Sequence, residues 1–154
     1  MTKVDLLKRC AYFRELNDEQ LKQLSSMAHE EVYEVGGDLT KQGRFEDKIY
    51  VIEEGLVGLY LEMGPMSHHI IQSASNYEIV GWGSILEPPH RSTVTAKAIE
   101  TTKVLSFYGE ELKRLCETDP QIGCRVHRAI IAVVTTRLKN AYTQLMGVTI
   151  QDYS

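Results

Sequence analysis

The histidines of this sequence are the first candidates for chemistry, because imidazole binds metals and moves protons near neutral pH. His68 and His69 are adjacent. Neighbouring residues of a β-strand point to opposite faces, so we interpret them as a surface pair and not as chelators of one ion. His127 falls in a helical pattern, where we expect a packed or pH-sensitive side chain. No metal site is predicted.

Nucleophiles and carboxylates give no sign of an active site either. The sequence has no Ser-His-Asp, Cys-His or paired-carboxylate arrangement at a spacing that indicates catalysis. Asp47 and the pair Glu53-Glu54 are interpreted as solvated loop residues. No G-x-G-x-x-G or Walker-type phosphate loop is present. We therefore predict that the protein is not an enzyme, with no catalytic residue and no cofactor.

The composition is typical of one soluble globular domain spanning residues 1–154, with 43% hydrophobic and 25% charged residues. Lys and Arg number 17 against 21 Asp and Glu. This balance argues against nucleic-acid binding, which needs clustered positive charge. No apolar run approaches the roughly 20 residues of a membrane span, and no signal peptide is recognisable. We interpret Cys10, Cys116 and Cys124 as small buried thiols, reduced in a cytoplasm.

The elements that would position a site form three regions. Helices are predicted over about residues 3–28, where Asn17 offers an N-cap with Gln20 three residues later. Over about 31–107, glycines and prolines divide the chain into strand-length pieces rich in β-branched and aromatic residues. This pattern predicts a mainly β fold, a barrel, roll or sandwich, with flanking α-helices.

Helices are predicted again over about 109–147, and the longer one begins at Thr118-Asp119-Pro120 and ends near Gly147. Its apolar seam comprises Cys124, His127, Ile131, Val134, Leu138, Ala141 and Leu145. A second stripe beside it comprises Ile122, Val126, Ala129, Ile130 and Val133. A helix that is apolar on two sides usually packs on a second surface, so we predict a homodimer through residues 119–146. The alternative is one broad side facing the core.

Three stretches resemble the cyclic-nucleotide-binding domain family found in CRP/FNR-type regulators, protein-kinase regulatory subunits and gated channels. Residues 35–43 resemble its G-x-x-I-x-x-x-G turn, and residues 47–57 resemble D-x-x-Y-x-I-x-x-G-x-V. Residues 78–98 stand where the family keeps its phosphate-binding cassette. The resemblance covers about residues 8–147. It implies a jelly-roll-like double-stranded β-helix, an eight-stranded β-roll, with N-terminal helices and a long C-terminal helix that often dimerises.

The resemblance also implies where a ligand would bind. The family holds a cyclic nucleotide phosphate with an arginine and with backbone N–H groups at the start of a short helix. The matching ligand-binding residues here are Gly81, Trp82, Gly83, Ser84, Ile85, Arg91, Ser92 and Thr93.

Two departures from the family pattern bear on this site. Trp82 replaces the glutamate that accepts from the ribose hydroxyl, and an extra residue follows Arg91. A one-residue slip turns a strand side chain to the opposite face, so Arg91 points into the site only if a bulge restores it. Otherwise Ser92 or His90 takes its place.

We therefore predict a stand-alone cytoplasmic sensor that binds a small anionic effector, with cyclic AMP or cyclic GMP as weak candidates, and signals through its C-terminal helix. The alternative is a degenerate module that binds no small ligand and acts as a dimeric protein-interaction scaffold. The family's DNA-binding helix-turn-helix is not expected, because only seven residues follow Gly147. Some relatives bind haem through a histidine, an alternative role for His127 that a Soret band would reveal.

Overall fold

Short helices open the chain in the computed structural model, which describes residues 1–86, 88 and 90–153. They are α1 (Lys3–Arg9), a first 3-10 turn, η1 (Ala11–Phe13), and α2 (Asp18–Ser26). The predicted cap of α2 is confirmed: the Asn17 side chain accepts from the Gln20 N–H, and the Gln20 side chain accepts from the Asn17 N–H.

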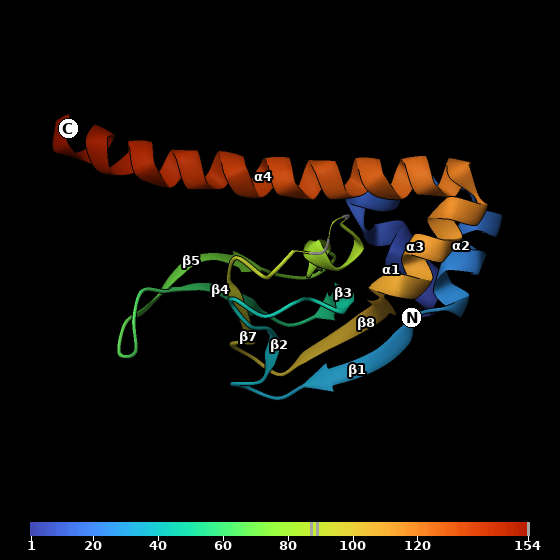
Figure 1. Cartoon of the computed structure of the whole chain (residues 1–154), viewed down its shortest axis with the longest axis horizontal. Helices are drawn as coiled ribbons and strands as arrows, with labels where there is room; N and C mark the ends of the chain where they lie inside the picture. The colour runs from blue at the N-terminus through green and yellow to red at the C-terminus, as the bar shows by residue number, and fades with distance from the viewer. Residues whose placement is uncertain (87, 89, 154) are drawn as a thin grey trace.

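Within the described residues, eight strands follow, arranged as two four-stranded antiparallel sheets in the orders β1-β8-β3-β6 and β2-β7-β4-β5. The strands are β1 (His29–Tyr33), β2 (Asp38–Thr40), β3 (Lys48–Glu54), β4 (Val57–Glu62), β5 (His68–Ala74), β6 (Ile79–Val80), β7 (Thr95–Ala98) and β8 (Thr102–Tyr108). A second 3-10 turn, η2 (Trp82–Ile85), follows β6. This architecture confirms the predicted β-roll with flanking helices (Figure 1).

The side-chain alternation of β3 divides the interior into two hydrophobic cores. Ile49 and Val51 belong to the core between the roll and the helices, whereas Tyr50 and Ile52 belong to the core between the sheets. Successive residues of a strand face opposite sides, so one strand serves both cores.

Helix α3 (Gly109–Thr118) and helix α4 (Pro120–Tyr153) close the chain. Asp119 caps α4 as predicted, because its Oδ1 accepts from the N–H groups of Gln121 and Ile122 at 3.2 Å each. In Figure 1, α4 runs along the whole molecule, from the helical end past the hairpin of β4 and β5. The predicted end near Gly147 is wrong. A glycine inside a helix costs only about 1 kcal/mol, and no proline follows it.

The two apolar sides of α4 have different environments. The second stripe of the sequence analysis is buried throughout: Ile122, Val126, Ala129, Ile130 and Val133. The seam is largely exposed, with Ile131 64% and Leu145 71% accessible. The alternative of one broad core-facing side is therefore wrong for most of the seam, although Val134 packs against the core between the roll and the helices.

The three cysteines are free thiols in three different environments. Cys10 is buried, Cys116 is half-buried and Cys124 is exposed, so the prediction of small buried thiols is wrong for Cys124, which lies on the exposed seam of α4. His68 and His69 are both exposed on β5, as predicted for a surface pair. Among the described residues, no helix has both the length and the apolar character that crossing a membrane requires.

Candidate ligand-binding site

A cavity of about 250 Å³ lies between the roll and α4. Its lining residues come from the loop before β3, from β4, β5, β6 and η2, from the segment before β7, and from α4. They are Glu46, Leu59, Ile71, Gln72, Ile79, Val80, Gly81, Trp82, Thr93, Val94, Val134, Arg137 and Leu138. Most of them are apolar. The cavity therefore suits a small molecule with an apolar body and a few polar groups.

Three of the predicted site residues, Gly81, Trp82 and Thr93, line this cavity. Gly81 adopts a φ of 87°, in the left-handed region, and a Cβ atom there would lie 2.5 Å from the Lys48 carbonyl oxygen. Only glycine fits such a position. The turn at Gly81 thereby brings Trp82 to the cavity wall, where its indole also packs on the core of the helices.

Three further predicted residues, Gly83, Ser84 and Ile85, are buried behind the cavity wall. Ile85 is 3% exposed and belongs to the core between roll and helices. Ser84 packs against the start of α3, where a Cβ on Gly109 would lie 2.3 Å from the Ser84 carbonyl oxygen. The structure therefore gives these residues packing roles, and ligand contact by any of the eight remains a prediction.

Arg91 does not line the cavity. Its exposed side chain donates from Nη1 to the Gly43 carbonyl oxygen at 2.7 Å, and its guanidinium lies 4.4 Å from the centre of the Phe45 ring. Ser92 is buried instead, and its hydroxyl donates to the Val94 carbonyl oxygen at 2.6 Å. Arg91 pairs with Phe45 in an isolated bridge before β7 begins at Thr95, and its side chain points away from the cavity.

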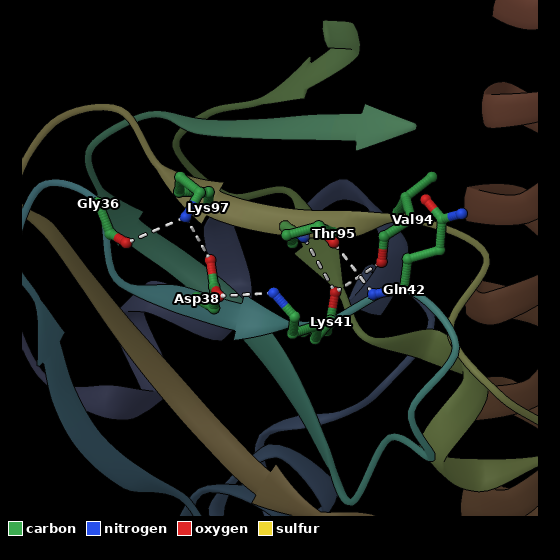
Figure 2. A network of polar contacts seen from close by, with 9 residues as sticks. Gly36, Asp38, Lys41, Gln42, Val94, Thr95 and Lys97 are labelled. Carbon is green, nitrogen blue, oxygen red and sulfur yellow. Dashed lines mark hydrogen bonds and ion pairs between the residues drawn. The ribbon is translucent and has the colours of Figure 1, made fainter. Parts of the chain in front are cut away.

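Hydrogen bonds across the strand pairs explain this register. Gly43 N–H donates to the Ser92 carbonyl at 2.9 Å, and Ser92 N–H donates to the Arg44 carbonyl at 2.8 Å. Figure 2 shows how β2 and β7 continue the pairing. There, Lys97 Nζ lies 2.8 Å from an Asp38 carboxylate oxygen, and the Gln42 N–H donates to Thr95 Oγ1 at 3.0 Å.

The Glu46 carboxylate lies beside Gly83 of the cassette. The sequence analysis did not predict Glu46 as a site residue. A Cβ on Gly83 would lie 2.6 Å from Glu46 Oε2, so the absence of a side chain at Gly83 admits the carboxylate. Burial raises the pKa of the Glu46 carboxyl, and weaker polar contacts with the Ser92 hydroxyl and the Gly83 N–H oppose that rise. Nothing in the local sequence around Glu46 indicates that its side chain is buried.

Arg137 and Gln72 were also missed. Among the described residues that line the cavity, Arg137 is the one cation, and it donates to the carbonyls of Ser73 and Ile79 at 3.3 Å each. Gln72 Nε2 donates to the Arg137 carbonyl oxygen at 3.0 Å. A signal for Arg137 was present, since it stands four residues after Val133 and so continues the buried stripe of α4 with a charged residue.

The residues described by the structure include no cluster of three or more histidines, cysteines or carboxylates suited to hold a metal ion. His127 is exposed on the seam of α4, where its Nδ1 lies 2.7 Å from the Gly123 carbonyl oxygen.

The family model of the cyclic nucleotide-binding domain matches residues 30–119, more than half of the chain. Among curated proteins, no sequence matches. The N-terminal domain of a transcriptional regulator from Streptomyces coelicolor is 27% identical, with a TM-score of 0.71 over 88% of this chain and 93% of that chain.

Two more distant structures share the fold. A cyclic nucleotide-binding domain from Methylobacillus flagellatus is 16% identical, with a TM-score of 0.81 over 94% of this chain and 81% of that chain. The regulatory subunit of a cAMP-independent protein kinase A from Trypanosoma brucei is 14% identical, with a TM-score of 0.73 over 96% of this chain and 50% of that chain.

Proposed function

Because this chain belongs to the cyclic nucleotide-binding domain family, we propose that it is a regulatory module that senses a small effector in the cavity and reports it through α4. The observation that supports this most directly is the position of Val134, Arg137 and Leu138, which place α4 in the cavity wall. An effector that enters the cavity contacts the helix itself.

Polar contacts with the roll make α4 responsive to the cavity. Gln72 and Arg137 connect β5 and β6 to the helix beside the cavity, and Gln144 Nε2 donates to the Ile71 carbonyl farther along. An effector that binds one position of α4 more tightly than another shifts the population between the two. These contacts are the ones that would break or re-form.

Cyclic AMP and cyclic GMP are the first effectors to test, and we expect weak binding of both. Arg91 lies outside the cavity, and Trp82 offers no acceptor to a ribose hydroxyl. An unpaired buried hydroxyl costs about 1–3 kcal/mol, roughly ten- to a hundredfold in affinity. The fold does not require cyclic AMP, since the related Trypanosoma brucei regulatory subunit is described as cAMP-independent.

The output of the module is proposed to pass through a second copy of the chain. Ile131, Leu138 and Leu145 recur every seven residues on the exposed seam of α4, a spacing that pairs helices. Free thiols at all three cysteines support a reducing, cytoplasmic setting for this work.

Fluorescence tests the sensing proposal, because Trp82 is the chain's one tryptophan and lines the cavity. Titration with cyclic AMP, cyclic GMP and a library of small metabolites is followed by emission and checked by calorimetry. We expect a saturable change with at least one compound, abolished by Val134→Phe, which fills the cavity, and unaffected by Arg91→Ala. Binding that survives Val134→Phe and is lost with Arg91→Ala would place the site elsewhere.

A degenerate scaffold is the second candidate, favoured by the Trp82 indole in the cassette and by the Glu46 carboxylate that packs against Gly83 of the cassette. Sedimentation velocity tests its dimer. Leu145→Glu is expected to yield a folded monomer, whereas the control Lys139→Glu, on an exposed polar position of α4, stays dimeric. A wild-type dimer that binds no compound supports the scaffold. A wild-type monomer contradicts dimerisation through the seam, whichever of the two functions is correct.

A further inference from the structure

Two buried oxygen atoms of the cavity residues have no hydrogen-bond donor. Among the described residues, none makes a hydrogen bond of good geometry to Glu46 Oε2 or to Gln72 Oε1, and solvent reaches neither atom. The Ser92 hydroxyl and the Gly83 N–H make only weaker polar contacts with the Glu46 carboxyl. Both residues line the cavity beneath α4. Buried polar atoms are almost always paired in folded proteins, so two unpaired acceptors around one cavity indicate a partner that is not part of the chain.

The orientation of the Gln72 amide follows from its other contact. Its Nε2 donates to the Arg137 carbonyl oxygen at 3.0 Å, and a carbonyl oxygen can accept but never donate. The amide nitrogen must therefore face α4, which leaves Oε1 as the unpaired atom. Its remaining lone pairs need an N–H or O–H group.

The Glu46 carboxylate lies where the family cassette would receive an anion. Its Oε2 packs against Gly83 so closely that a Cβ at Gly83 would be 2.6 Å away. When Glu46 is ionised, a ligand anion beside it would place two like charges in a poorly solvated space, which is strongly unfavourable. Arg91, the cation expected to offset such charge, is bound to Gly43 outside the cavity. Arg137 lies on the cavity wall, but its guanidinium already donates to the Ser73 and Ile79 carbonyls and lies 3.8 Å from a Glu78 carboxylate oxygen.

We infer that the cavity takes a small molecule with an apolar body and N–H donors, and that it discriminates against anions. The donors pair with Glu46 and Gln72, and the body contacts the aliphatic wall and Trp82. This inference rests on the proposed function, because it names the class of effector for the same cavity. It differs from the family expectation in the sign of the ligand charge.

Three probes with the same ring and different polar groups test the inference: benzamide, a neutral N–H donor, benzamidine, a cationic donor, and benzoate, an anion with no donor. Each is titrated into the wild-type protein and followed by Trp82 emission, with calorimetry as a second readout. We expect benzamide or benzamidine to bind at least tenfold more tightly than benzoate. The better of the two shows whether the effector is neutral or cationic.

Glu46→Gln separates charge from shape. In this variant we expect benzoate to bind roughly tenfold more tightly than in the wild type, because the repelling carboxylate is gone. Glu54→Gln, at an exposed glutamate on β3 outside the cavity, is the matched control and leaves all three affinities unchanged.

The outcomes distinguish the inference from the function on which it rests. Benzoate binding as tightly as benzamide and benzamidine in the wild type overturns the inference and leaves the sensor intact, and this comparison does not depend on any variant folding. Cyclic nucleotides binding more tightly than the donors also overturns it. No response to any probe, nucleotide or metabolite overturns both.

Discussion

Close approach of another part of the backbone requires glycine at Gly109 and at Gly81. At Gly109, the first residue of α3, a Cβ would lie 2.3 Å from the Ser84 carbonyl oxygen and 2.9 Å from its carbonyl carbon. At Gly81, a Cβ would meet the Lys48 carbonyl oxygen. Backbone atoms cannot rotate away from an added Cβ as the end of a side chain can. The absence of a side chain at these two glycines therefore lets η2 pack closely against β3 and α3.

Gly109→Ala is therefore expected to lower the free energy of unfolding by about 1–3 kcal/mol, because α3 and η2 must separate. Urea denaturation measures the change. Gly147→Ala, where no atom lies within 4 Å of the added Cβ, is the control and should stabilise the helix by up to about 1 kcal/mol. Equal effects of the two substitutions would show that α3 and η2 are not in close contact.

Glu46 predicts a pH dependence of stability. Burial raises the pKa of its carboxyl in the folded chain above the ordinary value of 4.5. The folded state then binds the proton more tightly than the unfolded state does, so the free energy of unfolding falls as the pH rises from 4.5 through the folded pKa. Glu46→Gln is expected to stabilise the protein more at pH 8 than at pH 4.

Thermal or urea unfolding of wild type and variant at the two pH values measures this difference. Glu54→Gln, at an exposed position, is the control and should change stability equally at both. A Glu46→Gln effect that is the same at pH 4 and pH 8 would mean that the Glu46 carboxyl is well solvated in the folded protein.

At the scale of elements, α4 has one apolar side that is buried and another that is largely exposed. Ile122 is fully buried against the core, whereas Ile131, nine residues later, is 64% exposed. Ile122→Ala is expected to lower the free energy of unfolding by about 2–5 kcal/mol, because it leaves a cavity in the core. Ile131→Ala is expected to change it by less than about 1 kcal/mol.

Chemical denaturation at low protein concentration compares the two isoleucine variants without a contribution from association. Comparable losses at both positions would mean that the seam also packs on its own domain. The seam would then be unavailable to a second copy of the chain.

At the scale of the whole molecule, the helices and the roll share strand β3. Ile49 and Val51 pack toward the helices, while Tyr50 and Ile52 pack between the sheets. Because both cores contain side chains of β3, unfolding of one core disrupts the strand on which the other core depends. We expect one cooperative unfolding transition, with far-ultraviolet circular dichroism and Trp82 fluorescence giving the same midpoint. Separate midpoints would show that the two cores unfold independently.

The sequence by itself determined the architecture. Glycines and prolines at strand-length intervals, the cap at Asn17 and the start of α4 at Asp119 each act over a few residues, so they are readable without the fold. The two stripes of α4 were readable for the same reason, because helical periodicity assigns each residue to a side.

The tertiary structure alone decided which side chains meet in the cavity. Arg91 faces outward and Ser92 inward because residues 43 and 44 pair with Ser92, a register set between segments about 50 positions apart in the chain. Glu46 and Gln72 reach the cavity from separate elements, and their lack of donors depends on how those elements pack. Local sequence specifies where a strand or helix begins, whereas long-range pairing specifies which of its faces becomes the site.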